Sequence, residues 1–112
     1  KIFKKKKIYV WNDKPVRDFI FAEDAADAVV KLLNSKFTGV INLGSGKSHS
    51  VKRLTNIISS HSKKKIETTH KKVTGPYKFL TDINLIKKVI KWKPKYSLEK
   101  GLLKTYNIMK NY

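Results

Sequence analysis

Arg17 stands just before the part of this chain whose residue types are best suited to binding chemistry. The apolar residues at 19–21 predict a short strand because aromatic and β-branched side chains favour strands. Glu23, Asp24 and Asp27 then predict the start of a helix, since carboxylates are stabilised near its positive end. A strand, a tight turn and a helix would therefore hold one guanidinium where it could bind an anion such as a phosphate.

The rest of the chain predicts a small mixed α/β fold, with strands and helices alternating along 112 residues. Ser50 and Ser97 are predicted N-caps, and Asp82 is a predicted cap of a short helix that ends before Pro94. Leu102, Leu103, Tyr106 and Met109 are the predicted buried side of the last helix. The predicted strands cover 8–11, 19–21, 40–43 and 66–69, and the predicted helices cover 23–35 and follow Ser50, Asp82 and Ser97.

The net charge of +18 raises the possibility of a nucleic-acid or polyanion partner. Only Arg17 and Arg53 are arginines, however, and arginine is the residue that contacts phosphate and guanine in a bidentate way. Abundant lysine, isoleucine, asparagine and tyrosine are what A+T-rich coding would produce. We therefore rank a compositional origin of the charge above a nucleic-acid partner.

Composition excludes several other classes of site. There is no cysteine, so disulfides and thiolate metal ligands are excluded. His49, His61 and His70 have no acidic residue at metal-ligand spacing, so we expect surface histidines and no metal. No apolar run approaches the roughly 20 residues that span a bilayer, and no secretory leader is visible. We expect a soluble, cytoplasmic chain without a membrane partner.

The run from Arg17 to Ala28 follows the pattern R-D-F/Y-I/V-x-V-x-D-x-A-x-A except at one position, where Ala22 stands in place of valine. It resembles the C-terminal half of extended short-chain dehydrogenases, the NAD(P)-dependent epimerases and dehydratases of nucleotide-diphosphate sugars. The motifs of this family occur in the same order and with similar spacing along nearly the whole chain. The further matching segments are 8–13, 39–46, Ser50-Val51 with Leu54, Thr81-Asp82, 92–94 and 97–102.

The resemblance implies roles for individual residues. Arg17 would contact the diphosphate, Phe19 would lie beside the nucleotide, and Val51 would contact the base. Each has a plainer alternative: Arg17 paired with Asp18 or another acid, and Phe19 and Val51 as core residues. The glycines of the turn at 44–46 would bring the backbone near the nucleotide, although a simple strand-to-helix turn explains Lys47 and Ser48 equally well.

The second phosphate-binding element of the family, R-x-G-D/E, is altered in this chain. Counting back from Asp82 places Lys72 at the arginine and Gly75 at the acid that would bind the ribose. Lys72 still offers a point charge to phosphate. The nucleotide is left open among UDP, dTDP, GDP, CDP and ADP.

Two family motifs are not found. No G-x-x-G-x-x-G loop follows a strand, and Ile41 stands where a P-loop at 44–48 would need its first glycine. The pair Tyr106 and Lys110 has the Tyr-x-x-x-Lys spacing but falls in the terminal helix, where the family has only a packing helix. We therefore assign no catalytic and no cofactor-binding residue, and expect NAD(P) to bind elsewhere in a parent enzyme.

Together these patterns predict that residues 1–112 form the C-terminal substrate-binding domain of a larger sugar epimerase or dehydratase. The start at Lys1 suits a fragment of this kind. The fragment would be inactive alone, would bind a nucleotide-diphosphate sugar, and would need the missing N-terminal Rossmann domain; the parent could form a homodimer. The alternatives are a lysine-rich nucleic-acid or polyanion-binding module and a merely structural remnant.

Overall fold

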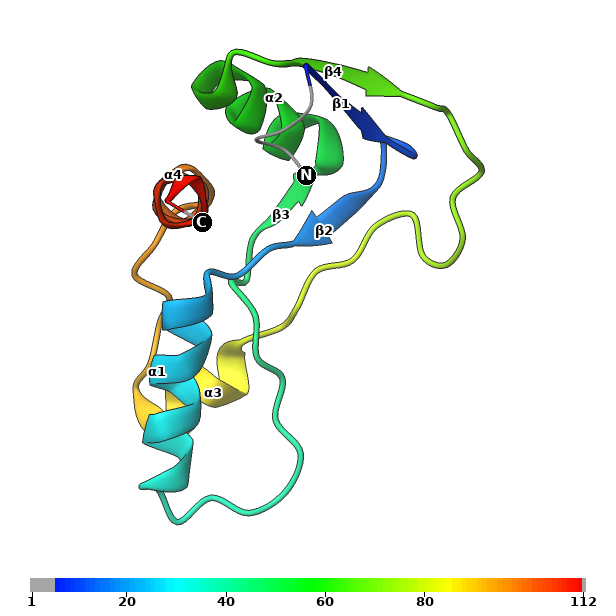
Figure 1. Ribbon diagram of the computed structural model, residues 1–112. Coiled ribbons are helices and arrows are strands. Elements are labelled where there is room, and N and C mark those ends of the chain that lie inside the picture. The colour runs from blue at the N-terminus through cyan, green and yellow to red at the C-terminus, as the bar shows by residue number, and fades with distance from the viewer. Residues whose placement is uncertain (1–5, 112) are drawn as a thin grey trace.

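Residues 6–111 are described by a computed structural model of the protein (Figure 1). Strands and helices alternate as the sequence predicts, which confirms the small mixed α/β fold. In chain order they are β1 (Lys7–Val10), β2 (Val16–Asp18), α1 (Ala22–Leu33), β3 (Ser48–Ser50), α2 (Val51–Ser62), β4 (Lys65–Thr68), α3 (Asn84–Ile90) and α4 (Leu98–Lys110). None of the helices in the described part of the chain has the length and apolar character needed to cross a bilayer.

The strands form two separate pairs. β1 lies parallel to β4, with Lys7 opposite Lys65, and β2 lies antiparallel to β3, with Val16 opposite Ser50. An isolated bridge joins Val16 to Lys78 on the other side of β2. As Figure 1 shows, the β2–β3 pair connects an upper group of β1, β4 and α2 with a lower group of α1 and α3.

Two serines are the N-caps of α2 and α4. Ser50 Oγ accepts a hydrogen bond from the Arg53 amide at 3.1 Å, and Ser97 Oγ accepts one from the Lys100 amide at 3.3 Å. Both predicted N-caps are confirmed. Asp82 also accepts a bond, from the Asn84 amide at 2.8 Å, but the residue at the N-cap of α3 is Ile83.

A small apolar core lies between α1, α3 and the segment that follows α3. Its buried members are Ala28, Ile83, Ile86 and Trp92, and the Trp92 side chain is only 1% exposed. Ile41 and Leu43 pack against this core from the long segment that precedes β3. The core therefore fixes the position of both chain segments that flank the candidate site.

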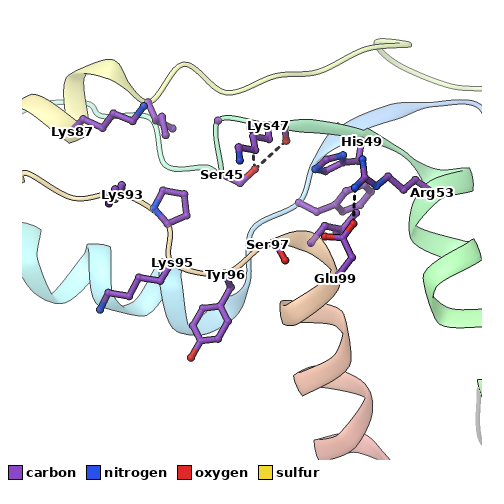
Figure 2. Close-up of a pocket in the computed structure, with 15 residues that line it drawn as sticks. Ser45, Lys47, His49, Arg53, Lys87, Lys93, Lys95, Tyr96, Ser97 and Glu99 are labelled. Carbon is purple, nitrogen blue, oxygen red and sulfur yellow. Dashed lines mark hydrogen bonds and ion pairs between the residues drawn. The ribbon is translucent and has the colours of Figure 1, made fainter. Parts of the chain in front are cut away.

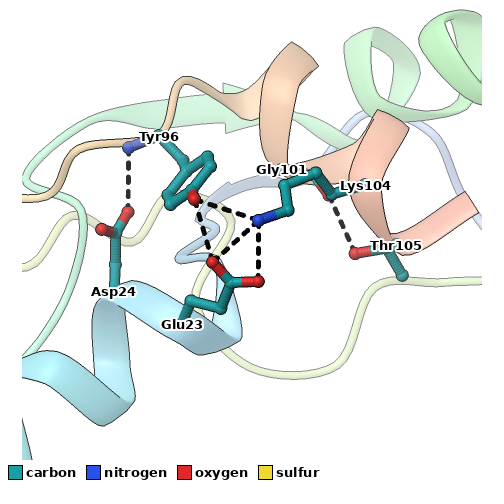
Figure 3. Close-up of polar contacts among 6 residues, drawn as sticks. All are labelled: Glu23, Asp24, Tyr96, Gly101, Lys104 and Thr105. Atoms are coloured by element: carbon teal, nitrogen blue, oxygen red, sulfur yellow. Dashed lines mark hydrogen bonds and ion pairs between the residues drawn. The ribbon is translucent and has the colours of Figure 1, made fainter. Parts of the chain in front are cut away.

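Polar contacts attach α1 to the segment before α4 (Figure 3). The Asp24 carboxylate, 2% exposed, accepts hydrogen bonds from the amides of Lys95 at 2.9 Å and Tyr96 at 3.0 Å. Glu23 accepts bonds from Tyr96 Oη at 2.9 Å and from Lys104 Nζ at 2.8 Å. The acids predicted to favour the helix terminus thus also hold a distant segment in place.

Three local predictions are wrong. Residues 19–21 are not a strand: β2 ends at Asp18 because its partner β3 begins at Ser48, and the loop before β3 bonds to the Asp18 side chain instead of to the backbone of 19–21. Residues 40–43 are in no strand, since no described segment pairs with them, although Ile41 and Leu43 face the core as the alternation predicts. On α4, Leu103 and Met109 are exposed by 39% and 55% because α4 packs chiefly against α2.

Candidate functional site

The Asp18 side chain binds the loop that precedes β3. Its carboxylate accepts hydrogen bonds from the amides of Ser45 at 2.9 Å and Gly46 at 3.0 Å, and a further short bond from Ser45 Oγ. Burial raises the pKa of Asp18, but the bonds from Ser45 and Gly46 and one from Thr81 outweigh it, so this pKa lies below its ordinary value. The charged carboxylate therefore fixes the loop beside Arg17 and Phe19.

Two glycines make the close approach of this loop possible. A Cβ at Gly44 would lie 2.5 Å from Thr81 Cβ and 2.7 Å from an Asp18 carboxylate oxygen, so no side chain fits there. Gly46 has a φ of +69°, in the left-handed region that glycine adopts most easily. Both glycines serve the bond network of Asp18, which the sequence did not predict.

Arg17 is half-buried on β2 and has no acidic partner among the described residues. Its Nη1 donates to the backbone carbonyl oxygens of Val16 at 2.8 Å and Tyr77 at 3.1 Å. The alternative in which Asp18 neutralises Arg17 is not what the structure shows, because Asp18 is bound to the loop. The guanidinium charge is therefore positioned by carbonyl groups and is not cancelled.

The other predicted binding residues lie in different surroundings. Phe19 is half-buried and lines a cleft of the molecule. Val51 is half-buried at the start of α2, where its amide donates to Pro15 O at 2.8 Å. Lys72 is exposed in the segment after β4, and within residues 6–111 no polar contact joins it to Arg17. Arg17, Val51 and Lys72 do not line the cleft; their substrate roles stay predictions.

The cleft has a volume of about 510 Å³ and lies between two chain segments (Figure 2). Figure 2 shows the segment with Ser45, Lys47 and His49 on one side and the segment from Lys93 to Glu99 on the other. Its apolar surface comes from Phe19, Ile83 and Leu98. Its basic side chains are Lys47, His49, Arg53, Lys87, Lys93 and Lys95.

The acid that lines the cleft, Glu99, is already paired. Arg53 Nη2 lies 2.6 Å from Glu99 Oε1, and this hydrogen bond is the main cause that lowers the pKa of Glu99 to about 2. Lys95 extends toward α1, with Nζ 3.9 Å from an Asp27 carboxylate oxygen. The cleft is consequently a basic surface with an apolar floor, a combination suited to an organic anion.

Sequence reasoning missed three members of this cleft. His49 was predicted to be a surface residue, but it is half-buried on β3 directly opposite Arg17. Lys47 and Arg53 received no binding role. The available signal was the spacing of Lys47 and His49, two residues apart before the Ser50 cap, which places alternate residues on one side of an extended segment.

The Arg53–Glu99 pair predicts an acid-sensitive contribution to stability. Because the folded pKa of Glu99 is depressed from its ordinary 4.5 to about 2, the contribution is present above pH 4.5 and is lost as the pH falls toward 2. We expect the melting temperature of the wild-type chain to fall more steeply over this range than that of Glu99→Gln. Parallel slopes in thermal melts at pH 5, 4, 3 and 2.5 would contradict the assignment.

No cluster of three or more histidine, cysteine, aspartate or glutamate residues able to hold a metal is found within residues 6–111.

Comparison with known proteins places this chain in a family. The family model described as GDP-mannose 4,6 dehydratase matches residues 1–105. The chain belongs to this family. The predicted resemblance to extended short-chain dehydrogenases that act as nucleotide-sugar epimerases and dehydratases is thereby confirmed.

Relatives within this group carry several activities in their names. A GDP-L-fucose synthase of Sinorhizobium fredii is 37% identical over 102 residues, which are 87% of this chain and 32% of the relative. A UDP-glucuronate 4-epimerase of Thermodesulfobacterium geofontis is 31% identical over 95% of this chain and 34% of its own length. The chain thus spans about a third of the length of these curated relatives.

Solved structures share the fold at lower identity. An NAD-dependent NDP-hexosamine 5,6-dehydratase, TunA, superimposes with a TM-score of 0.89 at 23% identity, over 99% of this chain and 38% of that protein. UDP-glucose 4-epimerase of Thermotoga maritima, solved with UDP-glucose, gives 0.85 at 22% identity over 94% of this chain and 35% of that protein. These members of the epimerase and dehydratase family carry the same small α/β fold as part of a longer chain.

Proposed function

We propose that this chain is the substrate-binding portion of an NAD(P)-dependent nucleotide-sugar epimerase or dehydratase. It binds the nucleotide-diphosphate sugar, while NAD(P) binds to another part of the enzyme and supplies transient oxidation and reduction of the sugar. Family membership and the names of the relatives support this proposal. By itself the chain is expected to bind and not to catalyse.

The observation that carries the proposal is the uncompensated charge of Arg17. A guanidinium without a carboxylate partner in the described residues retains its attraction for phosphate, and its planar arrangement of donors suits a diphosphate. Asp18, the nearest acid in sequence, is held by Ser45 and Gly46. Remote binding of the diphosphate would orient the sugar for reaction in the enzyme.

A second part of the proposal is that an N-terminal Rossmann domain covers this chain in the enzyme, which could itself be a homodimer. The described residues have a radius of gyration of 16.2 Å, against about 13 Å for a compact domain of this length. Several apolar side chains are exposed, among them Val30 at 56%, Leu33 at 79% and Val40 at 92%. Such surfaces on a protein commonly meet another domain or chain.

We predict that Arg17→Ala weakens a nucleotide-diphosphate sugar by roughly tenfold to a hundredfold, because a charge-assisted contact is worth about 1.5 to 3 kcal/mol. Arg17→Lys should recover only part of this affinity, since a point charge does not replace the planar arrangement of donors. The measurement is nuclear magnetic resonance titration of the 112-residue chain with UDP-glucose and GDP-mannose.

The control is Lys36→Ala, which removes one exposed positive charge elsewhere. Melting temperatures of all variants separate binding from folding. An Arg17→Ala chain that melts earlier yet binds as tightly as the wild type would show that Arg17 is structural and would remove it from the site.

A further inference from the structure

We propose that the cleft of Figure 2 receives the phosphate groups of the nucleotide sugar, and that Lys47, His49 and Arg53 are the side chains that bind them. This inference rests on the proposed function and adds three residues to its site. It places the ligand on the face of β2 and β3 that carries Arg17, with Phe19 as part of the apolar floor.

The register of β2 and β3 places His49 directly opposite Arg17. Arg17 is paired with His49 in the antiparallel ladder, and directly opposite residues of such a ladder have side chains on the same face, with Cβ atoms about 5 Å apart. Lys47 lines the same cleft as His49, from two residues earlier. Lys47 and His49 thus lie along one edge of the cleft, and Arg17 lies on the same face of the strand pair just outside it.

Arg53 is held in an orientation that leaves donors available. A guanidinium has five N–H donors, and Nη2 is the atom bonded to Glu99 in this chain. Within residues 6–111, Nε and Nη1 of Arg53 have no hydrogen-bond partner. Glu99 therefore fixes the Arg53 side chain in place, and the N–H groups of Nε and Nη1 can donate hydrogen bonds to a phosphate.

The backbone amides at the start of α2 cannot take the place of these side chains. The amide of Val51 donates to Pro15 O at 2.8 Å, that of Lys52 to Asp13 O at 2.7 Å, and that of Arg53 to Ser50 Oγ. The usual anion-binding groups of a helix N-terminus are already occupied. Binding in the cleft must then depend on side chains, so substitutions can remove it.

The size and polarity of the cleft define the chemical class of the ligand. A volume of about 510 Å³ is in the range of small-molecule sites, and the floor of Phe19, Ile83 and Leu98 suits a base or a sugar ring. Lys87 on α3 and Lys93 add positive charge from other parts of the lining. This combination selects an organic phosphate of nucleotide size over a bare inorganic anion.

The test is a titration of the 112-residue chain with UDP and GDP, and with inorganic pyrophosphate as the probe without a ring. Lys47→Gln, His49→Gln and Lys87→Gln should each weaken UDP or GDP about threefold to tenfold. The matched controls are Lys52→Gln and Lys88→Gln, which remove the same charge from exposed neighbours outside the cleft and should change affinity by less than twofold.

A gain of affinity provides a test that misfolding cannot mimic. Glu99→Gln keeps a side-chain oxygen that can accept the Arg53 bond but removes the negative charge beside the phosphate, so the nucleotide should bind about twofold to fivefold more tightly. If the cleft variants match their controls, or if Glu99→Gln weakens binding, the cleft is not the phosphate site. A wild-type chain that binds neither UDP nor GDP would overturn the proposed function itself, whereas normal binding lost only in Arg17→Ala would overturn this inference alone.

Discussion

Replacing buried Asp24 with alanine should destabilise the chain by about 3 to 5 kcal/mol, since it removes both acceptors of two backbone amides. The Asp24 carboxylate is 2% exposed and binds the Lys95 and Tyr96 amides from a position more than 70 residues away in sequence. Small domains have total stabilities of about 5 to 15 kcal/mol. The variant should therefore lose a large part of its folded population in urea or thermal unfolding.

Asp24→Asn separates geometry from charge at this position. The amide retains one acceptor oxygen, so we expect an intermediate loss. Glu23→Gln is the matched control on the neighbouring, exposed residue, where the contacts with Tyr96 and Lys104 lie at the surface and should contribute little. Equal stabilities of Asp24→Ala and Glu23→Gln would show that the two amide bonds do not hold the segment.

Trp92→Ala should lower the free energy of unfolding by about 3 to 5 kcal/mol, because it leaves a cavity at the centre of a small core. Trp92 is the largest fully buried side chain, and the core around it has few other members that could move into the space. Trp92→Phe keeps most of the apolar volume and should lose much less. Urea denaturation of both variants measures the difference.

Leu85 on α3 supplies the control for this substitution. Leu85 is 48% exposed, so Leu85→Ala should change the free energy of unfolding by less than about 1 kcal/mol. A Trp92→Ala chain as stable as Leu85→Ala would mean that the core described here is not the part that keeps the chain folded.

The sequence predicted those elements that depend on local chemistry. Ser50 and Ser97 begin helices because a serine hydroxyl can accept the bond of an amide three residues on, whatever surrounds it. The strand predicted at 66–69 is found at Lys65–Thr68, because it too was predicted from the residue types of one short segment. Family membership followed from the order of many such short patterns.

Other features depend on partners that are distant in sequence. Residues 19–21 and 40–43 have strand-forming side chains, yet a strand also needs a neighbour to bind its amides and carbonyls, and β3 reaches only Asp18. Of the predicted binding residues, Arg17 and Phe19 lie on or just after β2, but only Phe19 lines the cleft. The pairing of His49 with Arg17 depends on the register of β2 and β3, and the role of Arg53 depends on the contact of α2 with α4.

The segment around Val40 affects how the chain would behave in solution. Val40 is 92% exposed beside a stretch that alternates like a strand, and Leu33, which is 79% exposed, lies only a few residues earlier. An apolar stretch of this kind invites pairing between copies of the chain, while a net charge of +18 keeps the copies apart at low ionic strength. Added salt screens the repulsion but not the apolar attraction, so the solubility of the chain should be set by ionic strength.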